Sequence, residues 1–452
     1  MERIDVAVVG GGPAGSSAAR AAAERDKSVV VFEKGVPRED RDGLGSDSTD
    51  AAGLLDYWID LMAFEPEEIP EEIILRELSG ADFIGPNSAL ALDDTGIDAT
   101  YPNFGLAFDR AAFDDWLREE SELAGATYEV GTAVTDIKTE LNGGHTHTLS
   151  LANGEQIESE YLILADGPQR TVTIETLDQF TTPEKRIADV LNPAKVNHIA
   201  YQEHRRLPDG MVERDRLKFW WGYMPGHTAY PWIFPNDGDV ARVGLTMPIG
   251  LNIDEFNRDE WPLLKSDDER IPRGETYLKR LLELKYPEYD IEEMPLVENR
   301  GKRKGTETYA ISSTRPIESP TDAGIAVIGG AMGGTSAFHE GGDHIAVRTG
   351  KLAGELAGLD DLGQYNTAWK TVLDSEFTRN VTAAEIVHDY HPADWDRAFK
   401  TADTMLNRGK YTLGSTLKAG LSGIRLAWSY RQAKKRFKNG GYVQFSESEY
   451  AL

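Results

Sequence analysis

The sequence contains no cysteine at any of its 452 positions. This absence excludes disulfide bonds, thiolate metal sites, cysteine-ligated iron–sulfur clusters and a cysteine nucleophile. The sequence also lacks an apolar run of about eighteen residues, so no segment is predicted to span a bilayer. A redox enzyme built from such a chain must therefore borrow its electron-carrying chemistry from a soluble cofactor.

Basic residues are scarce: 48 Lys and Arg stand against 76 Asp and Glu, which gives a formal net charge of −28. This balance argues against nucleic-acid binding, because phosphate contacts need a basic surface. Such a surface repels itself at low ionic strength, whereas in molar salt the Debye length shrinks to ~3 Å. The simplest hypothesis is a halophilic protein adapted to a salty cytoplasm, and an ordinary acidic cytosolic protein is the alternative.

The N-terminal sequence MERIDVAVVGG has neither the basic segment nor the long apolar segment of a signal peptide. We therefore expect an intracellular, cytoplasmic protein. Domains usually contain roughly 100–200 residues, so a chain of this length is expected to form two or three of them.

The first 35 residues have the pattern of a βαβ unit. The apolar run 4–9 predicts a buried strand, the alanine-rich run 16–25 predicts a helix, and 27–35 predicts a second strand. The turn between the first strand and the helix fits the pattern G-x-G-x-x-G, formed by Gly10, Gly12, Pro13, Ala14 and Gly15. Such a turn lets backbone N–H groups approach a pyrophosphate at a helix N-terminus. A glycine-rich turn without function is the alternative.

Glu33 lies at the end of the second predicted strand, with Lys34 directly after it. An acidic residue at this point can accept hydrogen bonds from both ribose hydroxyls of an adenosine. The βαβ unit and this acidic residue together predict a dinucleotide cofactor.

Further along, 109–124 carries apolar residues at helical spacing, and Asn153-Gly154 lies between two strand-like runs, which predicts a hairpin. The region 196–247 is rich in aromatic residues interrupted by Gly and Pro, which favours a broad antiparallel sheet in a second domain. The run 324–330 returns to the pattern of the first strand, and the chain after about 360 is mostly helical in character.

Several motifs recur in a specific order: GGGPAG with FEKG, then DRAAFDDWL, LILADG, and IGGAMGG followed by EGG. In this order the chain resembles the geranylgeranyl reductase branch of FAD-dependent oxidoreductases, within the hydroxylase-like two-dinucleotide-fold group. The resemblance implies an α/β fold, α+β overall: a Rossmann-type FAD-binding domain, a mixed or antiparallel-sheet substrate domain and a helical C-terminal region. The bounds expected are 1–80, 105–175 and 300–360 for the FAD-binding domain, 81–104 and 176–299 for the substrate domain, and 361–452 for the helical region.

The resemblance also assigns roles to single residues around FAD. Arg110 corresponds to an arginine that reaches the ribityl–phosphate region, and a salt bridge to Asp114 one turn later is the alternative. The remaining positions that match cofactor contacts of the family are Leu44, Gly45 and Asp47 in a loop passing the flavin, Ala133 and Val134 near the adenine, and Asp166 and Gly167 beneath the cofactor.

The late motif departs from the family pattern of G-D-A-x-G, then proline, then G-x-G-I and a helix. Gly330 stands where the family has an aspartate that binds the ribityl chain, and Ala337 replaces the proline. Gly341 and Gly342 keep the glycine-rich turn, but Asp343 replaces an apolar residue. The helix that follows is still expected to point its N-terminus at the flavin, where its N–H groups would stabilise negative charge.

The stretch AYPWIFPNDGDVARVG resembles a family signature that lines a channel for a polyprenyl chain. Tyr230, Trp232 and Phe234 are therefore the predicted substrate-binding residues, since aromatic walls suit a long apolar ligand. The alternative is a packed core strand beside the flavin.

Three residues in AFHEGGDH could move protons near the flavin: His339, Glu340 and His344. Reduction of a C=C bond needs a hydride and a proton, and a histidine is well suited to supply the proton near neutral pH. His339 is the candidate catalytic residue, and a solvated loop histidine is the alternative.

The segment 404–446 contains no acidic residue, although it carries nine Lys and Arg between apolar residues that include Leu417, Leu421, Ile424 and Trp428. A basic amphipathic helix of this kind is typical of a peripheral membrane contact, here on the inner face. A helix docked on the acidic body is the alternative.

The leading functional prediction is an FAD-dependent reductase of isoprenoid double bonds in prenyl lipids. Alternatives are a monooxygenase of the same fold, an electron-transfer flavoprotein dehydrogenase feeding quinone, and a degenerate flavin-binding protein. No second nucleotide-binding βαβ pattern follows the first, so a ferredoxin or a transiently bound NAD(P)H is the expected electron donor.

Overall fold

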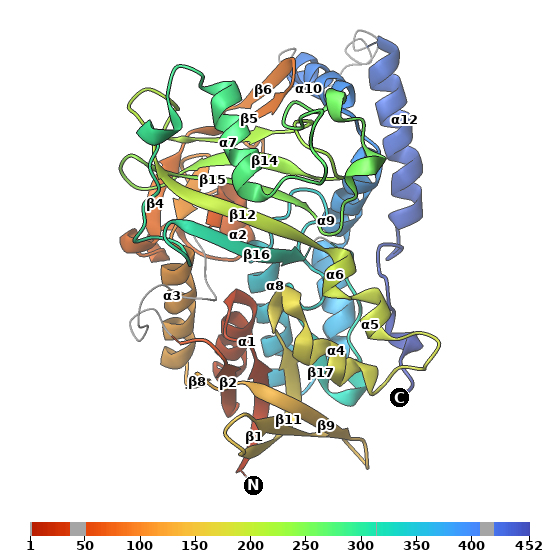
Figure 1. Cartoon of the computed structure of the whole chain (residues 1–452). Helices are drawn as coiled ribbons and strands as arrows, with labels where there is room; N and C mark the ends of the chain where they lie inside the picture. Colours follow the sequence, from red (N-terminus) through yellow and green to blue (C-terminus); the bar gives the residue numbers. More distant parts are fainter. Residues whose placement is uncertain (1, 37–50, 313, 407–419) are drawn as a thin grey trace.

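The computed structural model describes residues 2–36, 51–312, 314–406 and 420–452; of 420–428 it describes the backbone alone. Two sheet-based halves lie one above the other, and the C-terminal helices run along one side of both (Figure 1). The fold class predicted from the sequence is confirmed: a Rossmann-type half, a mostly antiparallel second sheet and a helical C-terminal region.

The first sheet has seven strands in the order β8-β2-β1-β11-β10-β9, with β17 also pairing with β11. The strands are β1 (Glu2–Val9), β2 (Val29–Glu33), β8 (Thr127–Val130), β9 (Val134–Glu140), β10 (Thr146–Leu151), β11 (Gln156–Leu164) and β17 (Ile325–Val327). β8, β2, β1, β11 and β17 are parallel, while β9 and β10 are antiparallel to their neighbours. The central strands are continuous apolar runs because both faces of a parallel sheet are covered.

The predicted hairpin is confirmed: β10 and β11 pair antiparallel, and Gly154 occupies the turn with φ +90°. The last three residues of β11 pair in parallel with β17. β11 therefore joins the hairpin to the strand that the chain adds to the first sheet at residues 325–327.

Helices α1 (Pro13–Ala23), α3 (Arg110–Leu123) and α8 (Asp343–Gly358) pack beside this sheet. A methyl group at Gly350 would come within 2.2 Å of the Ala14 carbonyl oxygen, and one at Gly354 within 2.0 Å of the Ala18 carbonyl oxygen. Two glycines therefore bring the backbones of α1 and α8 into direct contact.

The second sheet has seven strands in the order β16-β12-β15-β14-β13-β5-β6. They are β5 (Gly80–Gly85), β6 (Ser88–Leu92), β12 (Asn197–Arg206), β13 (Arg216–Trp220), β14 (Tyr230–Pro235), β15 (Val240–Pro248) and β16 (Thr306–Ser312). The pairings are antiparallel except that between β13 and β5. This confirms the broad sheet that the aromatic-rich region predicts.

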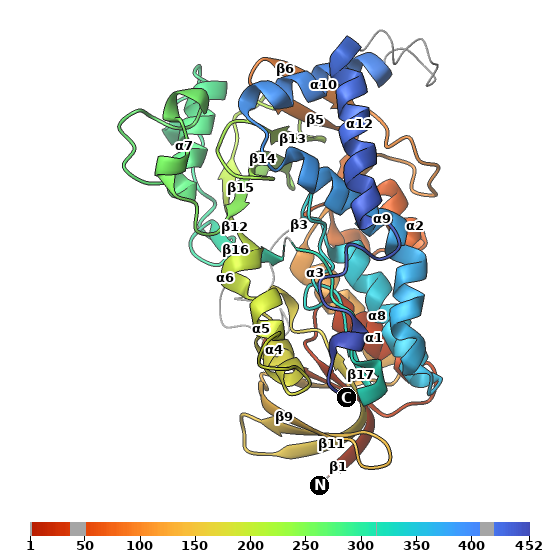
Figure 2. The same ribbon diagram turned by 90° about the vertical axis from the view of Figure 1, so that its right-hand side faces the viewer.

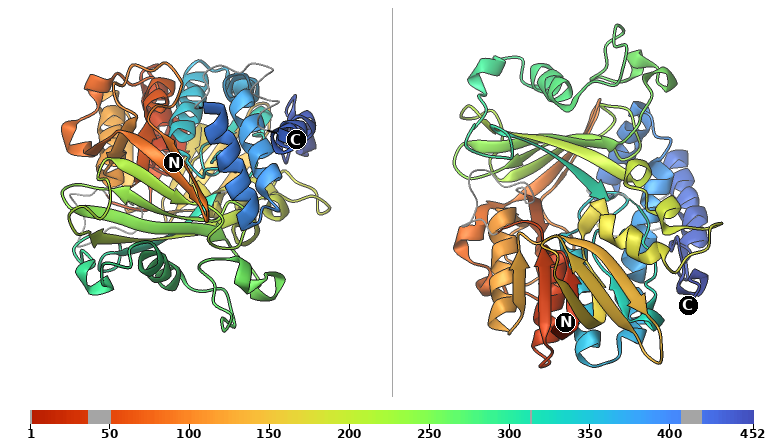
Figure 3. Two further views of the ribbon diagram at one scale, coloured as in Figure 1. Left: turned by 90° about the horizontal axis from the view of Figure 1, so that it is seen from above. Right: turned by 60° about the horizontal axis from the view of Figure 1, so that its bottom comes forward.

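The two faces of the second sheet bury different clusters. The outer face packs on α7 (Gly274–Lys285), as the view from above shows (Figure 3). The other face, here called the aromatic face, carries Phe219, Tyr230, Trp232 and Phe234 and is covered at one end by α10 (Pro392–Leu406). A small third sheet lies between the two halves. Its strands, in order, are β3 (Ala51–Leu55), β7 (Gly105–Phe108) and β4 (Ile74–Leu78), and α2 (Asp56–Leu61) follows β3 in the chain.

Among the C-terminal helices, α12 (Gly420–Phe437) packs against both α9 (Tyr365–Val387) and α10 (Figure 2). Beyond α12, Tyr442, Phe445 and Tyr450 return to the core of the first sheet, where Tyr442 lies 6.3 Å from the Trp369 ring. Short 3-10 turns occupy Pro66–Glu68, Glu71–Ile73, Gly167–Gln169, Ile253–Glu255, Arg258–Glu260, Ile291–Glu293, Thr321–Ala323, Leu362–Gln364 and Glu447–Glu449.

Two expected domain bounds need correction. Residues 306–312, expected in the FAD-binding domain, form β16 and hydrogen-bond to β12 at the edge of the second sheet. Residues 176–196, expected in the substrate domain, lie in α4 (Thr171–Asp178), α5 (Ile187–Val190), α6 (Pro193–Val196) and their connections. Leu177, Ile187 and Leu191 there are buried in the core of the first sheet, so this segment completes the first half.

Among the helices of the described residues, none combines the length and the apolar character needed to cross a membrane. In the same part of the chain, no group of three or more His, Asp or Glu side chains is placed to hold a metal ion.

Candidate functional site

Three glycine-rich loops converge where the parallel strands of the first sheet end. A methyl group at Gly10 would lie 2.4 Å from the Ala165 carbonyl oxygen, so the loops after β1 and β11 are in backbone contact. A methyl group at Gly329, after β17, would lie 2.9 Å from the Ala14 side chain. Gly330 in turn faces the backbone of Gly167. Ligands of open α/β sheets bind at this carboxyl edge, so the geometry marks it as the candidate site.

The loop after β1 presents a bare helix N-terminus. Gly12 is the N-cap of α1, and Pro13 follows it at the first helical position. Among the described residues, no side chain caps this helix end, and no atom outside the loop itself lies within 4 Å of a methyl group placed at Gly12. Gly15 is required for a different reason, since a methyl group placed there would come within 1.8 Å of the Gly10 carbonyl oxygen. Open N–H groups at a helix N-terminus are suited to a pyrophosphate.

Glu33 is fixed at the end of β2 by two backbone hydrogen bonds. Its Oε2 accepts from the Gly11 N–H and its Oε1 accepts from the Gly35 N–H, each at 2.6 Å. Each carboxylate oxygen retains a second lone pair for a ribose hydroxyl. Lys34 beside it is exposed. The structure therefore holds Glu33 in place for the role that the sequence predicts.

The segment predicted to meet the adenine lies next to Glu33. The Thr132 N–H donates to the Glu33 carbonyl oxygen at 3.0 Å, and Ala133 and Val134 follow directly. The Ala133 carbonyl oxygen accepts from the Ala152 N–H, while the Val134 side chain is buried.

Asp166 shapes the loop after β11. Its carboxylate accepts hydrogen bonds from the N–H groups of Val172, at 2.8 Å, and Thr173, at 3.1 Å. Burial raises the pKa of Asp166, and these hydrogen bonds oppose that rise. Gly167 follows with φ +70°, a conformation that favours glycine. Asp166 thus fixes the turn, and Gly167 leaves the backbone accessible.

Arg110 bridges α3 and the first residue of α8. Its Nε is 2.7 Å from the Asp114 carboxylate and its terminal nitrogen is 2.9 Å from that of Asp343. Burial works to lower the pKa of Arg110, but the two carboxylates together outweigh it and raise the pKa above its ordinary value. The salt bridge to Asp114, which the sequence left as the alternative, is therefore present, and Arg110 also lies at the α8 N-terminus.

Arg170 supports the late glycine motif, a role that the sequence did not indicate. It is fully buried, and its guanidinium donates to the Gly330 carbonyl oxygen at 3.1 Å and to the Ala331 carbonyl oxygen at 3.2 Å. Asn197 accepts a third bond at 3.1 Å. Burial lowers its pKa to about 10. Arg170 has a positive φ of 53°. No sequence motif predicts this conformation or the inward position of the side chain.

His339 is half-buried in an aromatic stack. Its ring lies 5.5 Å from the Trp58 ring, which in turn stacks on His344 at 4.3 Å. His344 Nε2 is 2.6 Å from the Glu376 carboxylate. Burial lowers the pKa of His339 to about 3, so its ring is neutral near pH 7. A neutral imidazole is a poor general acid, and this low pKa argues against His339 as the proton donor.

The aromatic face of the second sheet reaches this loop. Tyr230, Trp232 and Phe234 are 5%, 4% and 4% exposed, and the Trp232 and Phe234 rings stack at 5.2 Å. A methyl group at Gly244 would lie 2.4 Å from the Trp232 ring, so this ring covers β15 directly. The Tyr230 hydroxyl donates to the His339 carbonyl oxygen at 3.0 Å. The three predicted residues are thus packed, and Tyr230 contacts the loop before α8.

Leu44, Gly45 and Asp47 lie outside the described residues. Gly341 and Gly342 precede α8, where Gly342 is the N-cap, and the Gly341 N–H donates to His339 Nδ1 at 3.2 Å. Gly341 and Gly342 therefore form the turn that leads into α8.

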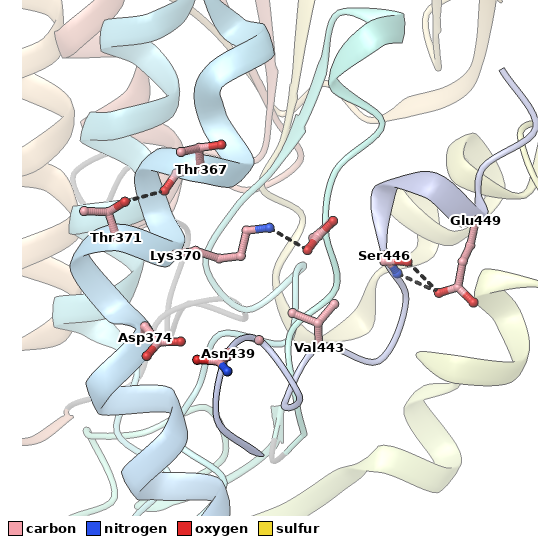
Figure 4. Close-up of a pocket in the computed structure, with 10 residues that line it drawn as sticks. Thr367, Lys370, Thr371, Asp374, Asn439, Val443, Ser446 and Glu449 are labelled. Atoms are coloured by element: carbon pink, nitrogen blue, oxygen red, sulfur yellow. Dashed lines mark hydrogen bonds and ion pairs between the residues drawn. The ribbon is translucent and has the colours of Figure 1, made fainter. Parts of the chain in front are cut away.

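A separate surface hollow lies between α9 and the C-terminal segment (Figure 4). It is lined by Thr367, Lys370 and Asp374 on one side and by residues 439–449 on the other. Lys370 is already paired with Glu318 at 2.7 Å. None of its lining residues belongs to the glycine-rich loops, so it has no part in the candidate site.

Comparison with known proteins agrees with this geometry. Residues 5–88 match the family described as the FAD binding domain. The chain carries an FAD-binding domain. It is 26% identical over 408 residues to digeranylgeranylglycerophospholipid reductase 1 of Methanococcoides burtonii, covering 87% of this chain and 86% of that protein. It is 28% identical to an enzyme of the same name from Methanosphaera stadtmanae, but there the match spans 55% of the relative.

Solved structures show the same fold. A geranylgeranyl bacteriochlorophyll reductase-like protein of Thermoplasma acidophilum superposes with a TM-score of 0.69 at 21% identity, covering 97% of this chain and 99% of that chain. The flavin-dependent brominase Bmp2, as a triple mutant, superposes with a TM-score of 0.60 at 15% identity, covering 96% and 99%.

The residues of the site fit FAD. The uncapped α1 N-terminus suits the pyrophosphate, Glu33 suits the adenosine ribose, and the α8 N-terminus with Arg110 suits the flavin end. FAD supplies hydride-transfer chemistry when bound, and these side chains would hold and orient it.

Replacing Glu33 with Ala should weaken FAD binding by about ten- to a hundredfold, because charged hydrogen bonds contribute roughly 1.5–3 kcal/mol and 1.4 kcal/mol is tenfold. Fluorescence titration of the apoprotein with FAD measures this. Glu129→Ala, at an exposed position in the neighbouring strand β8, is the control. Unchanged affinity in Glu33→Ala would disprove the assignment of β2 to the ribose.

Proposed function

We propose that this protein uses FAD to reduce C=C bonds in the isoprenoid chains of prenyl lipids. The observation that carries the proposal is the hydrogen bond from Tyr230 to the His339 carbonyl oxygen, which joins the aromatic face to the loop before α8. An apolar wall beside an FAD site suits a long hydrocarbon chain. The reductase names of the archaeal relatives support the same substrate class.

Electrons for the flavin come, in this proposal, from a ferredoxin or from NAD(P)H bound transiently. The described residues show one FAD-type βαβ unit, formed by β1, α1 and β2, and the glycine motif after β17 leads to a loop before α8 rather than directly into a helix. A flavin that is reduced from outside and oxidised by the lipid fits this arrangement.

The direct test mixes dithionite-reduced, FAD-loaded protein with a digeranylgeranylglycerol phospholipid in detergent without oxygen. Mass spectrometry should show two hydrogen atoms gained for each double bond reduced. A monooxygenase would give no product until oxygen was admitted, and then an oxygenated one. An absence of any reduced lipid would contradict the proposal.

Replacing Trp232 with Ala should lower the rate of lipid reduction about tenfold or more while flavin reduction stays unchanged, since a buried apolar side chain contributes roughly 1.5–3 kcal/mol. Ile233→Ala is the matched control, because Ile233 belongs to the same strand but packs in the cluster on the opposite face. Equal losses of lipid reduction and flavin reduction in Trp232→Ala would indicate that β14 is a packed core strand that does not contact the lipid.

We also propose that α12 places the protein against an anionic membrane on its cytoplasmic side. Ala433 and Phe437 are buried while Arg431, Lys435 and Lys438 are exposed, so the described turns have one packed side and one basic side. Arg436 pairs with Glu385 of α9, which is the docking that the sequence left as an alternative. Leu417 lies outside the described residues, as do the side chains of Leu421, Ile424 and Trp428.

Reversing three charges, as Arg431→Glu, Lys435→Glu and Lys438→Glu together, should reduce flotation with phosphatidylserine vesicles by about a hundredfold at low ionic strength, since each charge contributes ~1 kcal/mol. Lys279→Glu on the exposed face of α7 is the control. Deletion of the segment is unsuitable, because Tyr442, Phe445 and Tyr450 are buried in the first core. The proposal would be contradicted if the wild-type protein did not float with these vesicles.

A further inference from the structure

Glu340 is a buried carboxylate on a strained backbone. It lies in the loop before α8 with φ +61°, a conformation that side chains other than glycine rarely adopt, and its side chain is 2% exposed. Strained positions of this kind concentrate at functional sites. A buried carboxyl group on a strained backbone therefore indicates a functional role.

One oxygen of Glu340 is paired and the other is not. Oε1 contacts His198 Nδ1 of β12 and accepts a long hydrogen bond of 3.5 Å from the Thr228 hydroxyl. Oε2, like the Nε2 of His198, has no hydrogen-bond partner among the described residues. The imidazole makes the buried carboxylate tolerable, because an unpaired charge at this position would be costly.

Tyr230 places this pair beside the aromatic face, because its hydroxyl donates to the carbonyl oxygen of His339, the residue before Glu340. Burial raises the pKa of Tyr230 well above its ordinary value, and the charge of Glu340 adds to the rise. Burial likewise raises the pKa of the half-buried Tyr309, with contributions from Glu307 and Glu340, while Arg242 and Arg110 oppose the rise. The pair therefore lies where the aromatic face meets the loop before α8.

A row of histidines leads from this pair to solvent. The His198 ring lies 5.3 Å from the His227 ring, and the His227 ring stacks 5.0 Å from His388. The His388 side chain is 62% exposed and its Nδ1 is 2.8 Å from the Asp389 carboxylate. Burial, reinforced by the neighbouring histidines, lowers the pKa of His227 to about 4, so this ring is neutral near pH 7. A neutral ring is not itself a proton donor, but it can relay a proton by accepting one at one ring nitrogen while releasing one from the other.

We propose that the Glu340–His198 pair is the proton source for the site and is recharged from solvent through His227 and His388. This proposal rests on the proposed function. Reduction breaks the π bond of the alkene and forms two C–H bonds. Reduced FAD would supply the hydride to one carbon and would itself be oxidised, and the pair would give its proton to the other carbon. The pair is left one proton short, and water at His388 supplies the replacement.

Two variants test the pair. Glu340→Gln keeps the shape but cannot release the proton, and Glu340→Gly removes the carboxylate while relieving the positive φ. Both should reduce lipid about a hundredfold more slowly, the order of magnitude of a general acid, with flavin reduction unchanged. Glu340→Gly should melt at the same temperature as wild type or higher, which keeps the test valid if Glu340→Gln fails to fold. Glu307→Gln, which removes another buried carboxylate that accepts from Gln202, is the control.

A further readout follows the pair itself. NMR of nitrogen-labelled histidine in the FAD-bound protein should show the His198 ring signals displaced in Glu340→Gln, because the Glu340 carboxylate contacts His198 Nδ1 in the wild type. Wild-type rates and unchanged His198 signals in the variants would overturn the proposal. If wild type reduced no prenyl lipid, the proposed function would fail, and the His198 signals would still decide whether the pair forms.

Discussion

Helices α1 and α8 pack with their backbones in direct contact, and the candidate site depends on this contact. At Gly350 and Gly354 any larger side chain would collide with the carbonyl oxygens of Ala14 and Ala18. The short separation holds the two helices parallel, with the first turn of α1 beside Gly350 of α8, although some 330 residues separate the two helix starts in the chain. Two helix termini with favourable dipoles therefore face the same space, which suits the pyrophosphate and the flavin end of one dinucleotide.

Two arginines place positive charge around this site in a chain of strong negative charge. Arg110 holds α3 to the start of α8 through Asp114 and Asp343, and Arg170 holds the backbone at Gly330 through neutral acceptors. Gly330 lacks the side chain with which the resembling family binds the ribityl chain. Arg170 stabilises the carbonyl groups of the same turn, so the loop keeps a defined shape without that aspartate.

The sequence predicted the parts that local pattern determines. The βαβ unit, the glycine turn with Glu33 and the hairpin at Gly154 follow from spacing and turn chemistry, and each is present. Contacts between residues far apart in the chain could not be predicted from local pattern. The pairing of Glu340 with His198, the inward turn of Arg170 and the edge position of β16 depend on residues more than a hundred positions apart. No periodicity encodes such neighbours, and the segment 176–196 was misplaced for the same reason.

The central claim is that the two helix termini and Glu33 form one site for a whole FAD molecule. Calorimetric titration of apoprotein with FAD and, separately, with FMN tests it most directly. The account predicts one FAD per chain and binding of FMN at least about a hundredfold weaker, because FMN lacks the adenosine ribose that Glu33 is placed to bind. Equal affinity for the two flavins, or no binding of FAD, would contradict it.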